Sequence, residues 1–262
     1  MQLQVVQTLS QGERAELRQA RAALEHPGLA MQIANVVGTP IGYLMQKLPR
    51  GAKKTINNAT RAALLKALGT AIERIPPTSP RVKRTLAAIS GLLGGAMGWV
   101  GLVVDLPATT LLILKQIADV AGQQGADLDN PAVRLECLSV LALGNTAVSV
   151  HGEEGYFALR AALAQEVAAA AHFLAKQGTK KAASATPPAV LRLINMVAAR
   201  FSTPITEKAA AQVVPVLGAV SGATINYLFM EHYQKVAHAH FTIRRLERKY
   251  GIEVVEQVLM SL

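Results

Sequence analysis

Apolar positions recur along most of the chain with the spacing of an α-helix. In the stretch from residue 156 to 176, Leu159, Leu163, Val167 and Leu174 fall on one helical face. Polar residues such as His172 fall on another face. No stretch of alternating β-branched residues is long enough to indicate a strand. The pattern therefore predicts an all-α fold.

Proline preceded by a capping residue marks the expected start of five helices. Proline is favoured at the first helical position because the N–H group that it lacks would have no partner there. Ser10 and Glu13 form a capping-box pattern that predicts one further start. The five proline starts are Thr39-Pro40, Ser79-Pro80, Asn130-Pro131, Thr186-Pro187 and Thr203-Pro204.

The expected loops are short, with one exception. Residues 176–188 are polar, rich in small side chains and end in two prolines, which is typical of a mobile linker. The piece that follows is small for an independent core. We therefore expect a single compact multi-helix domain over residues 30–260, preceded by an N-terminal helical extension over residues 1–29.

Two long segments, residues 85–104 and 209–230, carry no charged side chain. Each contains glycines four residues apart, a spacing that lets the backbones of two helices approach closely. We expect a buried helical hairpin packed through these glycines, with insertion into a membrane as the alternative. The expected packing glycines are Gly94, Gly98, Gly218 and Gly222.

Asp105, Asn145 and Asn226 are lone polar residues in apolar surroundings. An unpaired polar group buried there would destabilise the fold, so we expect each to bind backbone groups, one another or a cation such as Arg160. Asp105 precedes Leu106 and Pro107, which predicts a helix break with Asp105 capping the next helix near residue 108. A ligand site is the alternative interpretation.

The net charge of +10 suggests an anionic partner. Aromatic residues are scarce and no nucleic-acid-binding motif is present, so nucleic acid is not expected. Basic residues beside apolar segments instead favour an anionic membrane surface or an acidic protein complex, although a merely solvated surface remains open. The expected binding residues are Arg81, Lys83, Arg84, Arg244, Arg245, Arg248 and Lys249.

No residue pattern indicates catalysis. Cys137, the single cysteine, has apolar helix neighbours and is expected to be a buried, inert thiol, in keeping with a reducing cytoplasmic setting. His232, His238 and His240 cannot converge on one metal ion from a single helix. The acidic run at residues 151–155 suits a first helical turn. We expect no metal, no cofactor and, on balance, no enzymatic activity.

Several segments resemble the EcsC family over roughly residues 30–260. They include VVDLPATTLLILKQIADVAGQQGADLDNPAVRLECLSVLALGN, YFALRAAL and VVPVLGAVSGATINYLFMEHYQKVAHAHFTIRRLERKYG. The family takes its name from the third gene of an operon that also encodes an ABC transporter, and it has no agreed catalytic residues. The resemblance implies a helical fold and a link to the cell envelope.

Together these observations predict a non-enzymatic helical protein on the cytoplasmic membrane face or in an envelope transporter complex. The N-terminal sequence has neither the basic nor the apolar region of a signal peptide, so a cytoplasmic protein, peripheral to the inner membrane, is expected. The alternative is a soluble helical module that binds a hydrophobic small molecule or a protein.

Overall fold

The computed structural model describes residues 9–25, 29–73, 98–144, 152–177, 187–213 and 218–262. Within these ranges the chain forms ten helices and no strand, in one compact domain, which confirms the predicted all-α fold. The helices are α1 (Gln11–Glu25), α2 (Leu29–Val37), α3 (Ile41–Lys47), α4 (Ala52–Glu73), α6 (Gly98–Gln123), α7 (Pro131–Leu143), α8 (Gly152–Gln177), α10 (Pro188–Ala211), α11 (Gly218–Tyr250) and α12 (Ile252–Ser261).

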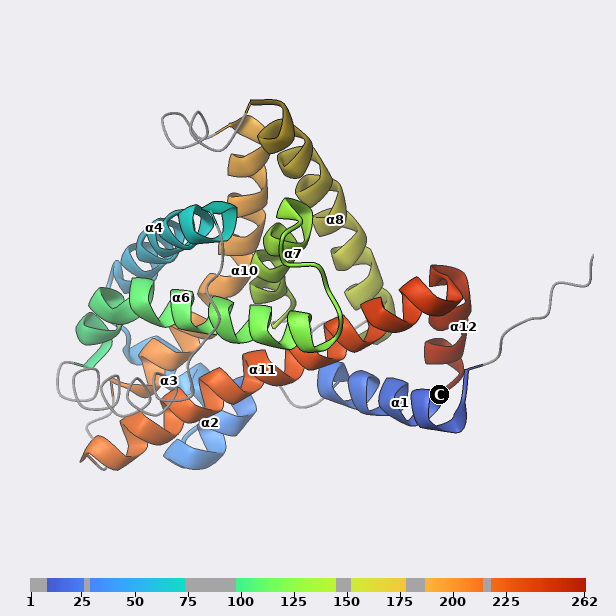
Figure 1. The fold of residues 1–262 in the computed structure, drawn as a ribbon. Coiled ribbons are helices and arrows are strands. Elements are labelled where there is room, and N and C mark those ends of the chain that lie inside the picture. The colour runs from blue at the N-terminus through green and yellow to red at the C-terminus, as the bar shows by residue number, and fades with distance from the viewer. Residues whose placement is uncertain (1–8, 26–28, 74–97, 145–151, 178–186, 214–217) are drawn as a thin grey trace, which may run out of the picture.

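Helix α10 occupies the centre of the fold and contacts α2, α3, α4, α6, α7 and α8 (Figure 1). The longest helix, α11, runs along one side, where it packs against α1, α2, α6, α7 and α12. The aromatic rings of Phe201, Phe229 and Tyr233 stack edge-on or tilted between α10 and α11 and are fully buried. A Cβ atom on Gly144 would lie 2.4 Å from Cε1 of Tyr233, so only glycine fits where α7 ends against this ring.

Most of the predicted helix starts that can be compared agree with the structure. The capping box forms: the Ser10 backbone N donates to Glu13 Oε2 at 2.9 Å, and the Glu13 N donates to Ser10 Oγ at 3.2 Å. Asn130 caps α7 by accepting from the backbone N of Ala132 at 2.9 Å. Helices α3 and α10 begin immediately after Pro40 and Pro187. Ser79-Pro80 lies outside the described residues.

The predicted start at Thr203-Pro204 is wrong, because Pro204 lies inside α10. Proline removes only one backbone donor from a helix, and tertiary packing can outweigh that loss. Here Phe201 and Ile205 are fully buried on either side of the proline. Burial of both flanking turns in the core accounts for the continuous helix.

The predicted helix break at Asp105 is also wrong, because α6 continues through Pro107. Asp105 therefore caps nothing; its Oδ2 accepts from Thr109 Oγ1, one turn along, at 2.6 Å. Helix α6 packs against both α4 and α11. Leu106 before the proline and Ile113 after it are both buried, and core packing on both sides accounts for one continuous helix.

The predicted glycine packing falls at the edge of what the structure describes. Gly94 lies outside the described residues. Gly98 and Gly218 are the first residues of α6 and α11, and Gly222 lies one turn into α11. These two helices do pack against each other, but close contact at the glycines themselves stays a prediction. The ends of the predicted linker belong to helices α8 and α10, and residues 178–186 lie outside the described ranges.

Candidate functional site

Six large apolar side chains are exposed on α2, α3 and the first turns of α6 and α11. These four segments gather at one end of the molecule (Figure 1). Val104 is 75 % exposed and Tyr227 is 64 % exposed. Large apolar side chains gathered on a surface are a common mark of an interaction site. We call this set the apolar end; its members are Met31, Val36, Tyr43, Val100, Val104 and Tyr227.

A run of exposed cations adjoins the apolar end. Residues 26–72 contain no Asp or Glu. Six basic residues in this part of the chain are exposed, and none forms an ion pair with a described acidic residue. Lys47 Nζ lies 5.1 Å from the centroid of the exposed Tyr43 ring, which joins the two sets. We call these six the basic segment: Lys47, Arg50, Lys53, Lys54, Arg61 and Lys66.

The C-terminal cations predicted to bind lipid lie together on α11 but are engaged within the chain. Arg244 pairs with Glu136 at 2.7 Å and with Glu247 at 3.0 Å. Arg245 pairs with Glu16 of α1, and Lys249 pairs with Glu13 of α1 at 2.8 Å. Arg248 donates to the carbonyl oxygen of Gln124 at 2.8 Å.

The other predicted binding group lies outside the described residues; its members are Arg81, Lys83 and Arg84. Asn145 also lies outside them.

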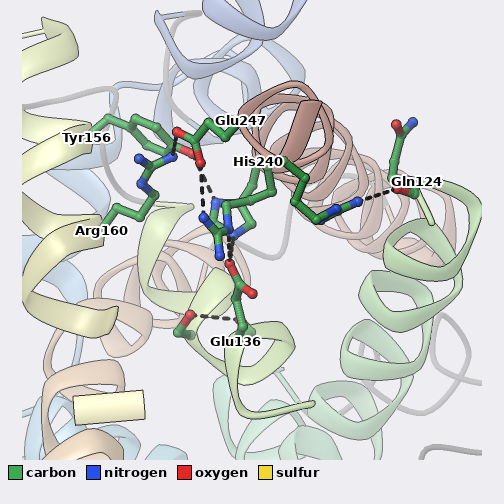
Figure 2. Close-up of polar contacts among 9 residues, drawn as sticks. Gln124, Glu136, Tyr156, Arg160, His240 and Glu247 are labelled. Atoms are coloured by element: carbon green, nitrogen blue, oxygen red, sulfur yellow. Dashed lines mark hydrogen bonds and ion pairs between the residues drawn. The ribbon is translucent and has the colours of Figure 1, made fainter. Parts of the chain in front are cut away.

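A buried polar network joins α7, α8 and α11 (Figure 2). The two nitrogens of His240 lie 3.0 Å from the Tyr156 hydroxyl and 3.0 Å from Glu136 Oε1. Glu247, with its carboxylate almost fully buried, forms ion pairs with Arg160 at 2.6 Å and with Arg244 at 3.0 Å. Two carboxylates and two guanidinium groups therefore balance each other at the junction of the three helices.

The protonation pattern of the network follows from its partners. Burial is the largest influence on Glu136 and raises its pKa, but His240 and Arg244 together outweigh it and bring the pKa to about 2. Because an ionised carboxylate can only accept, His240 Nε2 carries a proton and donates to Glu136. Burial raises the pKa of Tyr156 far above its usual value, so its hydroxyl stays protonated.

A tyrosine, histidine and glutamate in series could in principle relay a proton. However, Tyr156 and His240 are each no more than 2 % exposed, and the cavity found at this end of α11 does not reach them. Within the described part of the chain, the proton-transferring atoms are therefore closed to solvent. The geometry indicates that the network fixes the relative positions of α7, α8 and α11.

Lys208 brings together two of the predicted lone polar residues. Its Nζ donates to Asn226 Oδ1 and lies 4.7 Å from the centroid of the Phe229 ring. Burial lowers the pKa of Lys208 to about 8, and the charge of nearby Asp105 opposes that shift. Asp105 and Asn226 are partly buried and hydrogen-bonded, and the cation beside them is Lys208 rather than Arg160.

The remaining predicted residues take structural positions. Cys137 is fully buried and burial strongly raises the pKa of its thiol, as expected of an inert cysteine. His232 Nε2 lies 2.6 Å from the carbonyl oxygen of Gly144. Among the described residues, no group of three His, Cys, Asp or Glu side chains is placed to hold a metal ion.

One described helix, Trp99–Gln123 within α6, is long and apolar enough to cross a membrane by length and composition. Its most apolar window is 44 % buried against the rest of the protein. A core helix of a soluble protein passes the same test, so this helix alone carries no conclusion about membrane insertion.

The basic segment was not among the residues predicted to bind an anionic partner, because those residues lie beside the longest uncharged segments. The available signal was the absence of any acidic residue from residue 26 to residue 72. The exposed members of the apolar end could not be separated from core residues by composition, because burial depends on which helices pack together.

Comparison with known proteins yields one family. A sequence model described as the EcsC protein family matches residues 70–246, which is more than half of the chain. No curated protein and no solved structure matches the chain.

Proposed function

We propose that this chain, which belongs to the EcsC protein family, is a non-catalytic helical protein that attaches reversibly to the anionic cytoplasmic face of a membrane. The apolar end would enter the interfacial region of the bilayer. The basic segment would lie over the lipid phosphates. Proteins that lie on anionic bilayers combine these two features.

The observation that carries the proposal is the meeting of both features on α3. Tyr43 is 53 % exposed, and Lys47, one turn further along, lies over its ring. Tyrosine favours the membrane interface because its ring is apolar and its hydroxyl is polar. Arg50, Lys53 and Lys54 follow directly, all exposed.

The expected affinity follows from the number of charges. Each Lys or Arg near an anionic bilayer contributes about 1 kcal/mol. Six such residues would supply at most about 6 kcal/mol, which corresponds to a dissociation constant no tighter than some tens of micromolar. Insertion of apolar side chains would tighten this binding further.

Co-flotation with vesicles tests the proposal. The protein should float with vesicles of phosphatidylglycerol and phosphatidylcholine and remain unbound with phosphatidylcholine alone. The triple variant Arg50→Gln, Lys53→Gln, Lys54→Gln should bind roughly 100-fold more weakly, because it loses about 3 kcal/mol of attraction.

The triple variant Lys176→Gln, Arg192→Gln, Lys235→Gln is the matched control, since it removes the same charge from exposed sites on α8, α10 and the middle of α11. This control should retain most of the binding. An equal loss in both variants would show that net charge alone attracts the protein. Absence of wild-type binding at low salt would overturn the proposal and leave an acidic protein as the partner of this surface.

A further inference from the structure

Helix α1 lies against the outer side of α11 and also contacts α12 and α8 (Figure 1). Its apolar face is short: Leu17, Ala20 and Leu24 are the buried residues within the helix. Arg14 and Arg18 on the opposite face are exposed. An amphipathic helix of this kind can exchange one apolar surface for another.

The acidic residues of α1 sit directly on the basic residues of α11. Glu13 pairs with Lys249 Nζ at 2.8 Å and accepts from the Tyr250 hydroxyl at 2.8 Å. Glu16 pairs with Arg245. Glu16, Arg245 and Lys249 are exposed by 37 % or more, and ion pairs of such exposed groups contribute little stability, whereas the Glu13 carboxylate is 12 % exposed and more firmly held.

The packing beneath α1 is incomplete. A cavity of about 220 Å³ lies between α1 and α11, lined among others by Gln19, His238, Thr242 and the Glu16–Arg245 pair. The Nε atom of Arg245 is buried there without a hydrogen-bond partner in the described part of the chain. This cavity is partly open to solvent, so α1 and α11 touch over less area, and the unmade hydrogen bond weakens their contact further.

We infer that Arg245 and Lys249 on α11, with the exposed Arg248 beside them, form a second surface for anionic lipid, and that α1 covers Arg245 and Lys249 until a membrane displaces it. This inference rests on the proposed function for the identity of the partner. Lipid phosphates take the places of the Glu13 and Glu16 carboxylates. The released α1 then lays Leu17, Ala20 and Leu24 on the bilayer.

The test weakens the hold of α1 in the full-length protein. The double variant Glu13→Gln, Glu16→Gln removes the two carboxylates, and glutamine at position 13 preserves the capping box. The variant Glu253→Gln, Glu256→Gln on α12 is the control, because it changes the net charge by the same amount. Against phosphatidylglycerol vesicles, the α1 variant should bind at least tenfold more tightly than the control.

Two further measurements make the result specific. Adding Arg245→Gln and Lys249→Gln to the α1 variant should abolish the gain and leave binding through the basic segment. Hydrogen exchange should show that the amides of residues 11–25 lose protection when the wild-type protein binds vesicles, while those of α10 do not.

The outcomes separate the two proposals. If the wild-type protein binds but the α1 variant and the control bind equally, the inference fails and the proposed function stands. The same holds if α1 stays protected on vesicles. If the wild-type protein fails to bind and the α1 variant binds, the basic segment is not the docking surface and the inference stands. If neither binds, both are overturned.

Discussion

Single residues in the Glu136 network link helices that are distant in sequence. Glu136 on α7 accepts from His240 and Arg244 on α11, and Tyr156 on α8 completes the chain of contacts. Because the network pairs charged groups that the fold buries, it favours one arrangement of the three helices over alternatives with similar apolar packing.

The ionisation of Glu136 predicts how acid destabilises the protein. Its pKa is about 2 in the folded protein, against 4.5 as the ordinary value. A carboxyl group with a depressed pKa stabilises the folded state above pH 4.5, and that contribution is lost as the pH falls toward 2. Relative to Glu136→Gln, the wild-type free energy of unfolding should fall by on the order of 3 kcal/mol over this window.

Urea unfolding of both proteins between pH 7 and pH 2 measures this difference. The glutamine variant keeps the shape and one acceptor of the side chain but cannot titrate there. Parallel loss of stability in the two proteins would show that Glu136 is not held ionised by its neighbours.

The residues of this network could not have been predicted from spacing. Glu136 and His240 are 104 positions apart, and nothing local to either residue indicates the other. Pairing of this kind depends on how α7 and α11 pack.

The position of Cys137, in contrast, could be predicted, because its apolar helical neighbours alone imply burial. The basic segment could also have been predicted from the sequence, because the absence of acidic residues between residues 26 and 72 is enough to find it.

At the scale of helices, local sequence signals predicted where helices begin better than they predicted whether a proline interrupts a helix. Ser10 and Asn130 cap helices through contacts within three residues, so sequence suffices to find them. Pro107 and Pro204 resemble helix starts, yet both lie inside helices. Whether a proline begins or interrupts a helix depends on tertiary contacts that its neighbours in sequence do not reveal.

Replacement of Pro107 distinguishes a continuous α6 from two helices. Inside a helix, Pro107→Ala supplies an N–H group for the carbonyl of Val103 and should stabilise the protein by about 1–3 kcal/mol. Pro131→Ala is the control, because Pro131 is the first residue of α7 and its missing N–H has no helical partner. Thermal or urea unfolding compares them, and a loss of stability in both would favour a helix that starts at Pro107.

At the scale of the whole molecule, which has a net charge of +10, the basic residues differ in whether they have partners within the chain. The cations of α11 are largely paired with carboxylates or carbonyl groups, whereas the basic segment faces solvent. The family match covers residues 70–246, so the basic segment and α1 lie outside it. The proposed docking surface therefore belongs largely to the part of this chain that the match does not include.

The central claim is that the apolar end faces the bilayer. An environment-sensitive fluorophore on single introduced cysteines tests this claim most directly. Cys137 does not interfere, because it is fully buried. Labels at Tyr43→Cys and Val104→Cys should shift to shorter wavelength when phosphatidylglycerol vesicles are added, because these sites enter the bilayer. Labels at Ala161→Cys and Ala168→Cys, on the exposed face of α8, should not shift. A shift confined to the α8 sites, or none at Tyr43 and Val104 on vesicles that bind the protein, would contradict the account.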